Sequence, residues 1–157
     1  MCNVSAVVCV DAELDESWVK DVSQSENVIV SQWREVSADD QHELRDKVDK
    51  ILRPLGLETR QLVMRRANGV ALYFIYLTLS AVRSLREQWR SRQLGDIVEK
   101  LFTLLSTASN DDDDDGDTFL VKRLIWPVTE YEQCLDFFNS LQGKEFSYIL
   151  CTCNCLK

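Results

Sequence analysis

The sequence has few of the residues that break regular structure. Its 157 residues include two prolines and five glycines, against 45% apolar and 28% charged residues. This balance is typical of a globular domain and unlike that of a disordered chain. A chain of this length buries roughly 68–70% of its unfolded surface, so we expect it to fold as one domain without disulfides or bound metal.

The sequence also lacks long hydrophobic segments. No apolar run reaches the ~18 residues that a membrane-spanning helix needs. The first residues do not form the cationic segment and apolar core of a signal peptide. We therefore expect a cytoplasmic protein that does not contact a membrane, and the six cysteines are predicted to be thiols.

No basic excess is present. The formal net charge is −8, and six of the acids lie in one tract, residues 111–117. Without that tract the chain has 18 basic and 20 acidic residues, so the folded body is nearly neutral. A protein that binds nucleic acid needs cations to neutralise phosphates. The charge balance thus argues against a nucleic-acid partner.

Catalytic motifs are missing as well. His42 is the only histidine, and it lies early in a predicted helix beside acidic residues. A histidine without a positioned partner makes neither a general base nor a triad. No G-x-S-x-G, H-E-x-x-H or P-loop string occurs. We therefore expect no enzyme activity and no cofactor.

Two segments suggest metal ligands at first sight. Residues 111–116 begin like a calcium loop, but Lys122 stands where the bidentate glutamate belongs. Cys151, Cys153 and Cys155 alternate, whereas zinc sites favour C-x₂₋₄-C pairs and a fourth ligand. We interpret the first segment as a solvated linker and the second as a divergent tail, and we predict no metal site.

Hydrophobic periodicity predicts the elements of the first half. Residues 5–11 read as a buried strand, and residues 28–33 as an edge strand or a loop. Ser37 is a candidate N-cap for a helix that Pro54 and Gly56 end. The apolar face of that helix consists of Leu44, Val48, Ile51 and Leu52.

The second half predicts a hairpin, a long broken helix, a strand and a last helix. Asn68-Gly69 joins the runs 57–67 and 70–77, which is a strong hairpin signal. Thr78 or Ser80 caps a helix that breaks near Gly95. A strand over residues 119–126 follows. Thr129 and Glu132 have the spacing of a capping box, and the last helix has the apolar face Tyr131, Cys134, Leu135, Phe138 and Leu141.

The order of these elements predicts the fold. It reads β-α-β-β-α-β plus a C-terminal helix, which is the order of a ferredoxin-like two-layer α+β sandwich with a four-stranded, mainly antiparallel sheet. We expect the first strand and residues 70–77 to be central, parallel neighbours. The two other strands form the edges. The domain spans residues 1–142, and residues 143–157 form the tail.

The strand over residues 70–77 is apolar on both faces, and helices on one side of a sheet cover only one of them. The uncovered set is expected to form a binding surface, unless the segment before Ser37 folds over it. The two sets are Ala71, Tyr73, Ile75 and Leu77, and Val70, Leu72, Phe74 and Tyr76.

Four segments carry a resemblance to a known family. The opening strand reads S-A-V-V-C-V and is followed by Leu14-Asp15, and the hairpin leads into V-A-L-Y-F-I-Y-L. Residues 90–101 form a helical segment with a Gln93-Leu94 hinge, and residues 119–138 close the pattern. In this order the segments resemble the TRADD N-terminal domain, the family of N-terminal modules of TNF-receptor death-domain adaptors. The resemblance covers roughly residues 5–142.

The resemblance implies a non-catalytic adaptor that docks on a TRAF domain in death-receptor or innate immune signalling. The family's contacts come from the first strand, the hairpin and the central strand. This chain has Val7 and Cys9 where the family has aromatic anchors. The partner-binding residues that we predict are Val7, Cys9, Arg65, Leu72, Phe74 and Tyr76.

Two other functions remain open at this point. The first is a ferredoxin-like regulatory domain that self-associates without a TRAF partner. The second is RNA binding, because Tyr73, Phe74 and Tyr76 resemble the stacking aromatics of an RNA-recognition sheet. The preceding residues lack the basic-Gly-aromatic start of that signature, which favours the protein-interaction readings.

Overall fold

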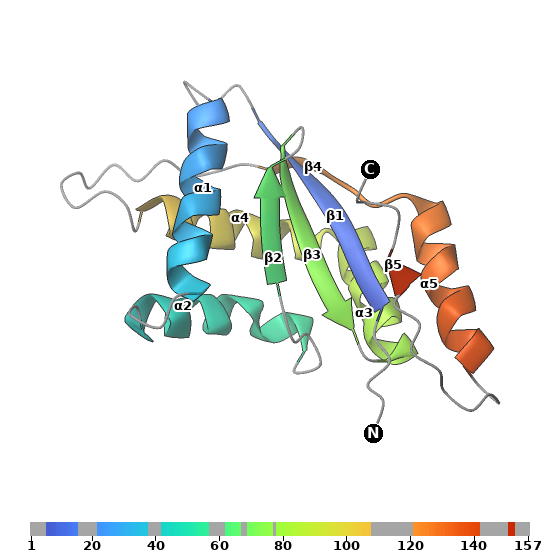
Figure 1. The fold of residues 1–157 in the computed structure, drawn as a ribbon. Coiled ribbons are helices and arrows are strands. Elements are labelled where there is room, and N and C mark those ends of the chain that lie inside the picture. Colours follow the sequence, from blue (N-terminus) through green and yellow to red (C-terminus); the bar gives the residue numbers. More distant parts are fainter. Residues whose placement is uncertain are drawn as a thin grey trace.

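The structure is a computed structural model that describes residues 6–15, 22–37, 42–56, 62–66, 69–76, 78–107, 121–141 and 151–152. It is a mixed α/β arrangement in which helices pack on and beside an antiparallel sheet, as the sequence predicts at this coarse level (Figure 1). The elements are β1 (Ala6–Leu14), α1 (Val22–Ser37), α2 (His42–Leu52), a short 3₁₀ helix η1 (Arg53–Leu55), β2 (Leu62–Arg66), β3 (Val70–Tyr76), α3 (Leu79–Arg90), α4 (Gln93–Thr107), β4 (Val121–Ile125), α5 (Val128–Leu141) and β5 (Cys151–Thr152).

The strands pair in the order β2-β3-β1-β4, and β5 pairs with the start of β1. β1 is antiparallel to β3 and to β4, β2 is antiparallel to β3, and β5 is parallel to β1. The expectation that β1 and β3 are parallel neighbours is therefore wrong. The crossover through α1 and α2 makes β2 parallel to β1. The hairpin then sends β3 back between those two strands, so it is antiparallel to both.

The predicted hairpin is confirmed, and its loop approaches β1 closely. Arg66 pairs with Val70, which leaves residues 67–69 for the loop instead of a two-residue turn. Gly69 has φ +146°, and a Cβ atom at this position would lie 2.7 Å from the backbone oxygen of Ala12. The glycine is thus required by its backbone angle and by the lack of space beside β1.

The main hydrophobic core lies between the sheet and the helices behind it in Figure 1. The alternate residues Val8 and Val10 of β1 and Leu72 and Phe74 of β3 are fully or almost fully buried there. They share this core with the buried faces of α3 and α4, including Val82, Leu85, Leu94, Val98, Leu101 and Phe102.

Helix α1 was not predicted. Residues 28–33, interpreted as an edge strand or a loop, lie in its middle. Ile29, Val30 and Val36 are buried and Trp33 is partly buried, which is helical spacing. The short run V-I-V conceals this spacing, because three adjacent apolar residues match a strand equally well. Ser37, the predicted N-cap of the next helix, is instead the last residue of α1.

The predicted break in the long helix is present, but not at Gly95. Ser91 and Arg92 separate α3 from α4, and Arg92 has φ +65°. Gly95 lies inside α4, where an added Cβ would have no atom within 4 Å. The start of α3 agrees with the prediction, because the Thr78 side chain accepts a hydrogen bond from the Ala81 N–H at 3.2 Å.

Helix α5 follows β4 and begins one residue before the expected cap. The N–H groups of Glu130 and Tyr131 donate to the Pro127 carbonyl, and the helix starts at Val128. The predicted capping box with Thr129 as N-cap is therefore wrong. Pro127 lies directly before the helix instead, and its carbonyl accepts hydrogen bonds from N–H groups of the first turn. The predicted apolar face is largely right, with Cys134 and Phe138 buried.

Candidate protein-interaction surface

The register of β1 and β3 divides their side chains between two faces. Cys9 pairs with Tyr73, and Val10 pairs with Leu72. Directly opposed residues of an antiparallel pair lie on the same face, and successive residues alternate. We call one face the core face; it contains Val8, Val10, Ala12, Val70, Leu72, Phe74 and Tyr76, and Leu14 is buried in the same core. We call the other the open face; it contains the register positions Val7, Cys9, Asp11, Ala71, Tyr73 and Ile75, and Glu13 follows Asp11 along β1.

Three of the predicted partner-binding residues are on the core face. Leu72, Phe74 and Tyr76 are at most 1% exposed. The expectation that they are available to a partner is therefore wrong. They are buried because α3 and α4 cover this side of β3. The prediction therefore assigned the wrong one of the two apolar sets of this strand to the binding surface.

The other three predicted residues are at register positions of the open face. Val7 pairs with Ile75, and Arg65 of β2 pairs with Ala71; their side chains lie outside the described part of the structure. Cys9 is 5% exposed and so offers little contact area. The six predicted residues thus do not form one surface, because they are divided between opposite faces of the sheet.

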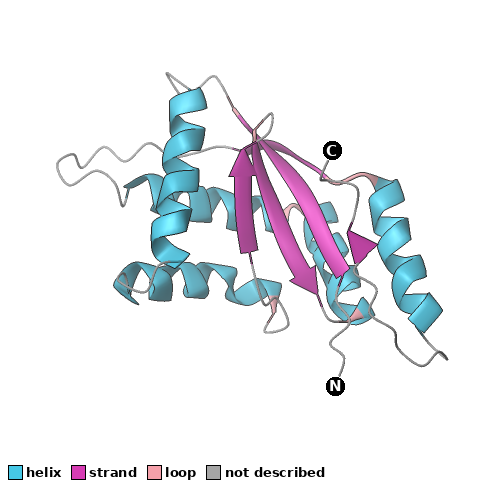
Figure 2. Cartoon of the chain, in the orientation of Figure 1, coloured by secondary structure: helices cyan, strands magenta, loops and turns pink. Residues whose placement is uncertain are grey.

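The open face has its own apolar residues. Tyr73 and Ile75 are half-buried, and neither belongs to the core or to the partly buried side chains packed on it. Ile125 of β4 pairs with Asp11, which places it on the same face, and it is 38% exposed. In Figures 1 and 2, no helix crosses the viewer's side of β2, β3 and β1 in the described part of the chain.

The sequence left open that the segment before Ser37 folds over this face. The described part of that segment is α1, and it packs against β2, α2 and α4. Its buried residues Ile29 and Val36 belong to the same core as Leu72. Helix α1 therefore extends the core face beyond the edge at β2 and does not itself cover the open face (Figure 1).

Charged side chains border the apolar residues of the open face. Glu13 accepts hydrogen bonds from Arg123 Nε and from Lys122 Nζ, the latter at 3.3 Å. These partners lower the pKa of Glu13, with the Arg123 hydrogen bond as the largest cause. Asp11 is exposed, and its directly opposed neighbours are Ala71 and Ile125, which have no charged or hydrogen-bonding side chain.

Glu130 at the start of α5 adds a second carboxylate near Asp11. Burial raises the pKa of Glu130, and the negative charge of Asp11 raises it further. Neither carboxylate forms an ion pair with a residue that the structure describes. Within the described residues, this end of the open face therefore has two carboxylates without a cation partner.

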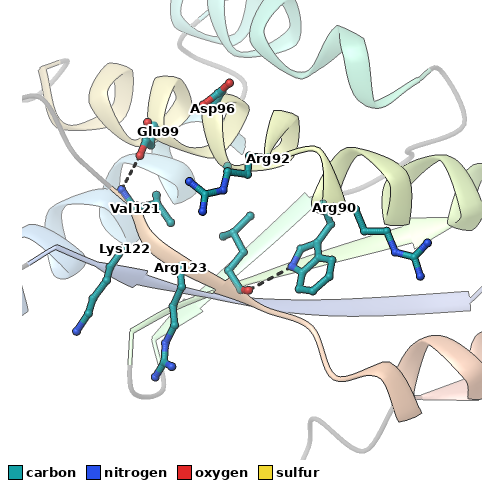
Figure 3. Close-up of a pocket in the computed structure, with 10 residues that line it drawn as sticks. Arg90, Arg92, Asp96, Glu99, Val121, Lys122 and Arg123 are labelled. Carbon is teal, nitrogen blue, oxygen red and sulfur yellow. Dashed lines mark hydrogen bonds between the residues drawn. The ribbon is translucent and has the colours of Figure 1, made fainter.

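A pocket of roughly 470 Å³ lies on the helical side, between the α3–α4 junction and β4 (Figure 3). Its polar groups connect β4 to the helices. Glu99 accepts the Val121 N–H at 2.8 Å, and Trp89 Nε1 donates to the Leu124 carbonyl at 3.2 Å. Lys122 and Arg123 extend from β4 away from the helices in this view. The arrangement holds a strand in place, and it contains no nucleophile with an adjacent base.

Within the described ranges, no three His, Cys, Asp or Glu side chains are grouped so that they could hold a metal ion. In those ranges, too, no helix has the length and apolar character that crossing a bilayer requires. His42 is exposed at the first residue of α2. The acidic tract and Cys153 and Cys155 lie outside the described residues.

Sequence reasoning missed Asp11, Tyr73, Ile75 and Ile125 as members of the open face. One signal was available: Asp11 and Glu13 alternate with Val10 and Ala12, which assigns the odd-numbered positions of β1 to solvent. Applying this to β3 needs the register, since no charged residue marks either of its faces. Comparison with protein-family models, with curated proteins and with solved structures found no match to this chain.

Proposed function

We propose that this protein is a non-catalytic, cytoplasmic interaction module that docks a protein partner through the open face. The observation that carries the proposal is the pair of half-buried apolar residues, Tyr73 and Ile75, on a side of the sheet that no described helix covers. Ile125, 38% exposed, lies on the same face, and apolar side chains that remain accessible on a sheet face are typical of a binding site. Tyrosine is also enriched among the residues that dominate binding energy.

The strand order supports a finer description of the fold. The order β2-β3-β1-β4, with antiparallel neighbours throughout, is that of a split β-α-β sandwich. The proposed fold is therefore ferredoxin-like, with an additional helix in the first crossover and α5 after the last long strand. Such a sandwich leaves one sheet face to solvent or to a partner.

For the partner, the proposal is a TRAF-type signalling domain. It rests on the resemblance of the opening strand, the hairpin and the α3–α4 segment to the TRADD N-terminal domain. The contact residues differ from those first predicted, since Leu72, Phe74 and Tyr76 are in the core. Tyr73 and Ile75 replace them, and Ile125 extends the surface onto β4.

The test is a pull-down of the purified chain against a panel of TRAF domains. We expect Tyr73→Asp and Ile75→Asp to abolish capture, because each places a charge in an apolar contact and leaves the core face untouched. Val128→Asp is the matched control. It makes the same change at a side chain that is 54% exposed on α5, at a helix start that tolerates an acid.

Circular dichroism of each variant separates lost binding from lost folding. Capture by wild type and Val128→Asp, but not by the folded Tyr73 and Ile75 variants, would support both the function and the face. Equal capture of all four proteins would exclude the open face. No capture of wild type by any TRAF domain would reject the proposed partner class.

A further inference from the structure

The pocket between the α3–α4 junction and β4 contains a guanidinium group without a protein partner. Figure 3 shows the Arg92 guanidinium between α4 and β4. It forms no ion pair or hydrogen bond with a residue that the structure describes. The first acid of α4 is Asp96, and its carboxylate lies on the side of the helix that faces away from β4 (Figure 3). The planar N–H groups of Arg92 can therefore donate to a ligand in the pocket.

The other basic residues of the pocket already have acidic partners. Arg90 lies 3.3 Å from the Glu87 carboxylate, and the two basic residues of β4 both bind Glu13. Of the four basic residues among the described lining of the pocket, Arg92 is the one whose charge is left for a ligand. One cation suits a ligand that carries one negative charge.

Two carboxylates of α4 also line the pocket, and they restrict the charge of a ligand further. Glu99 accepts the Val121 N–H at 2.8 Å, and Asp96 lies one turn earlier on the same helix. A dianion such as a phosphate ester brings two negative charges near them, whereas a carboxylate brings one. The two oxygens of a carboxylate also match the fork of N–H groups on a guanidinium. The lining therefore favours a monocarboxylate.

The pocket has room and apolar walls for the rest of such a ligand. Trp89, Val121 and Leu124 line it and are half-buried. Gly95 lines it too, and a Cβ atom added there would have no atom within 4 Å. The volume of roughly 470 Å³ lies in the range of sites for small organic molecules. A ligand with an apolar ring or chain next to its carboxylate fits these walls.

An extended protein chain cannot use the pocket by pairing with β4. Glu99 occupies the Val121 N–H, and Trp89 Nε1 donates to the Leu124 carbonyl at 3.2 Å. A chain that adds to a sheet edge needs N–H and C=O groups of this kind to be unpaired. The ligand is therefore compact, and it is not an added strand of a partner protein.

We propose that this pocket binds a small organic monocarboxylate, with the carboxylate on the Arg92 guanidinium and the apolar body beside Gly95 and Trp89. Arg92 adopts φ +65°, and residues at such sparsely populated backbone angles cluster at ligand sites. The pocket lies on the helical side of the molecule. This binding activity thus goes beyond the docking proposed for the open face and does not depend on it.

An NMR titration of the purified full chain tests the site. Benzoate is the probe, benzamide is its neutral counterpart of similar size, and phenyl phosphate is its dianionic counterpart. We expect benzoate to shift the Gly95 amide and Trp89 indole N–H signals saturably, with a dissociation constant on the order of 1 mM. The two counterparts are expected to bind about tenfold more weakly or less, because neither matches both the charge and the fork of Arg92.

Two variants remove the two parts of the site. Arg92→Gln removes the cation at an exposed position, and Gly95→Leu fills the space beside it with a residue that favours helix. Each is expected to weaken benzoate binding by about tenfold or more, followed at the Trp89 signal. Arg83→Gln is the control. It removes an exposed cation of α3 that does not line the pocket, and it should bind as wild type does.

The absence of saturable shifts with benzoate would overturn the proposal, and so would equal binding of benzamide. Tighter binding of phenyl phosphate would overturn the assignment to a carboxylate. Benzoate binding that persists in both Arg92→Gln and Gly95→Leu, with each variant folded by circular dichroism, would place the ligand outside this pocket. If Gly95→Leu does not fold, Arg92→Gln decides, since its side chain is exposed and outside the core.

Discussion

Arg86 is a buried cation held by aromatic rings. Its side chain is 5% exposed, and Nη1 donates to the Trp126 carbonyl at 3.0 Å. The guanidinium carbon lies 4.2 Å from the ring centre of Trp89 and 5.0 Å from those of Trp126 and Tyr131. Burial lowers the pKa of Arg86, and the charge of Arg90 lowers it further. Stacking on rings substitutes for a carboxylate partner.

Arg86→Ala is expected to lower the free energy of unfolding by about 2–4 kcal/mol, because it removes the ring contacts, the hydrogen bond and the packed side-chain stem together. Denaturant unfolding measures the change. Arg86→Lys keeps the charge but not the planar group, so it should recover only part of the loss. A decrease below ~1 kcal/mol for the alanine variant would mean that the ring contacts contribute little.

The raised pKa of Glu130 predicts that the stability of the fold depends on pH. Its pKa is raised in the folded state, so the folded protein holds this proton more tightly than the unfolded chain does. The contribution is fully present below the usual glutamate range and is lost as the pH rises through the raised value. Glu130→Gln should therefore stabilise the protein by about 0.5 kcal/mol near pH 7 and change little near pH 3.5.

Thermal unfolding at the two pH values measures this effect. Glu132→Gln, at an exposed position of the same helix, is the matched control. An equal gain from both substitutions at neutral pH would assign the effect to the net charge of α5 rather than to the environment of Glu130.

At the scale of elements, two glycines differ in whether a side chain could replace the hydrogen: Gly69 cannot accept one without strain, and Gly95 can. Gly69 combines φ +146° with a backbone oxygen 2.7 Å from the would-be Cβ, whereas Gly95 has open space around it in α4. Gly69→Ala is expected to cost about 2 kcal/mol or more, through strain and displacement of β1. Gly95→Ala is expected to stabilise the protein by about 0.5–1 kcal/mol through helix propensity. Comparable losses in denaturant unfolding would contradict this contrast.

The α3–α4 junction carries its own strain. Arg92 adopts φ +65°, a left-handed conformation that costs a residue with a side chain roughly 1 kcal/mol. Arg92→Gly should therefore raise the free energy of unfolding by about 0.5–1 kcal/mol, whereas Arg92→Ala retains the strain and should change it little. Equal effects of the two substitutions on the unfolding midpoint would show that the side chain, not the backbone angle, matters here.

At the scale of the whole molecule, the assignment of faces decides which variants unfold. Leu72 is fully buried between β3 and the helices, so Leu72→Asp is expected to abolish folding, and Leu72→Ala to cost about 2–5 kcal/mol. Tyr73→Asp, one residue along, should retain the helical circular dichroism signal. A folded Leu72→Asp protein together with an unfolded Tyr73→Asp protein would show that the core face and the open face are assigned the wrong way round.

The sequence by itself determined the elements whose signals are local. The β2–β3 hairpin follows from Gly69 between two apolar runs, and the Thr78 cap follows from a hydroxyl before an apolar stripe. The apolar face of α2, with Val48 buried, follows from its spacing. Each of these features depends on residues within about one helical turn or one tight loop, so the residue pattern was sufficient.

Only the tertiary structure decided which side of β3 is core. Both sets of its side chains are apolar, so no local preference separates Leu72 and Phe74 from Tyr73 and Ile75. The decision came from pairing with β1, where Asp11 and Glu13 mark one face for solvent, and from the side on which α3 and α4 pack. A strand that is apolar on both faces is oriented by its neighbours, because burying either set gains similar hydrophobic free energy.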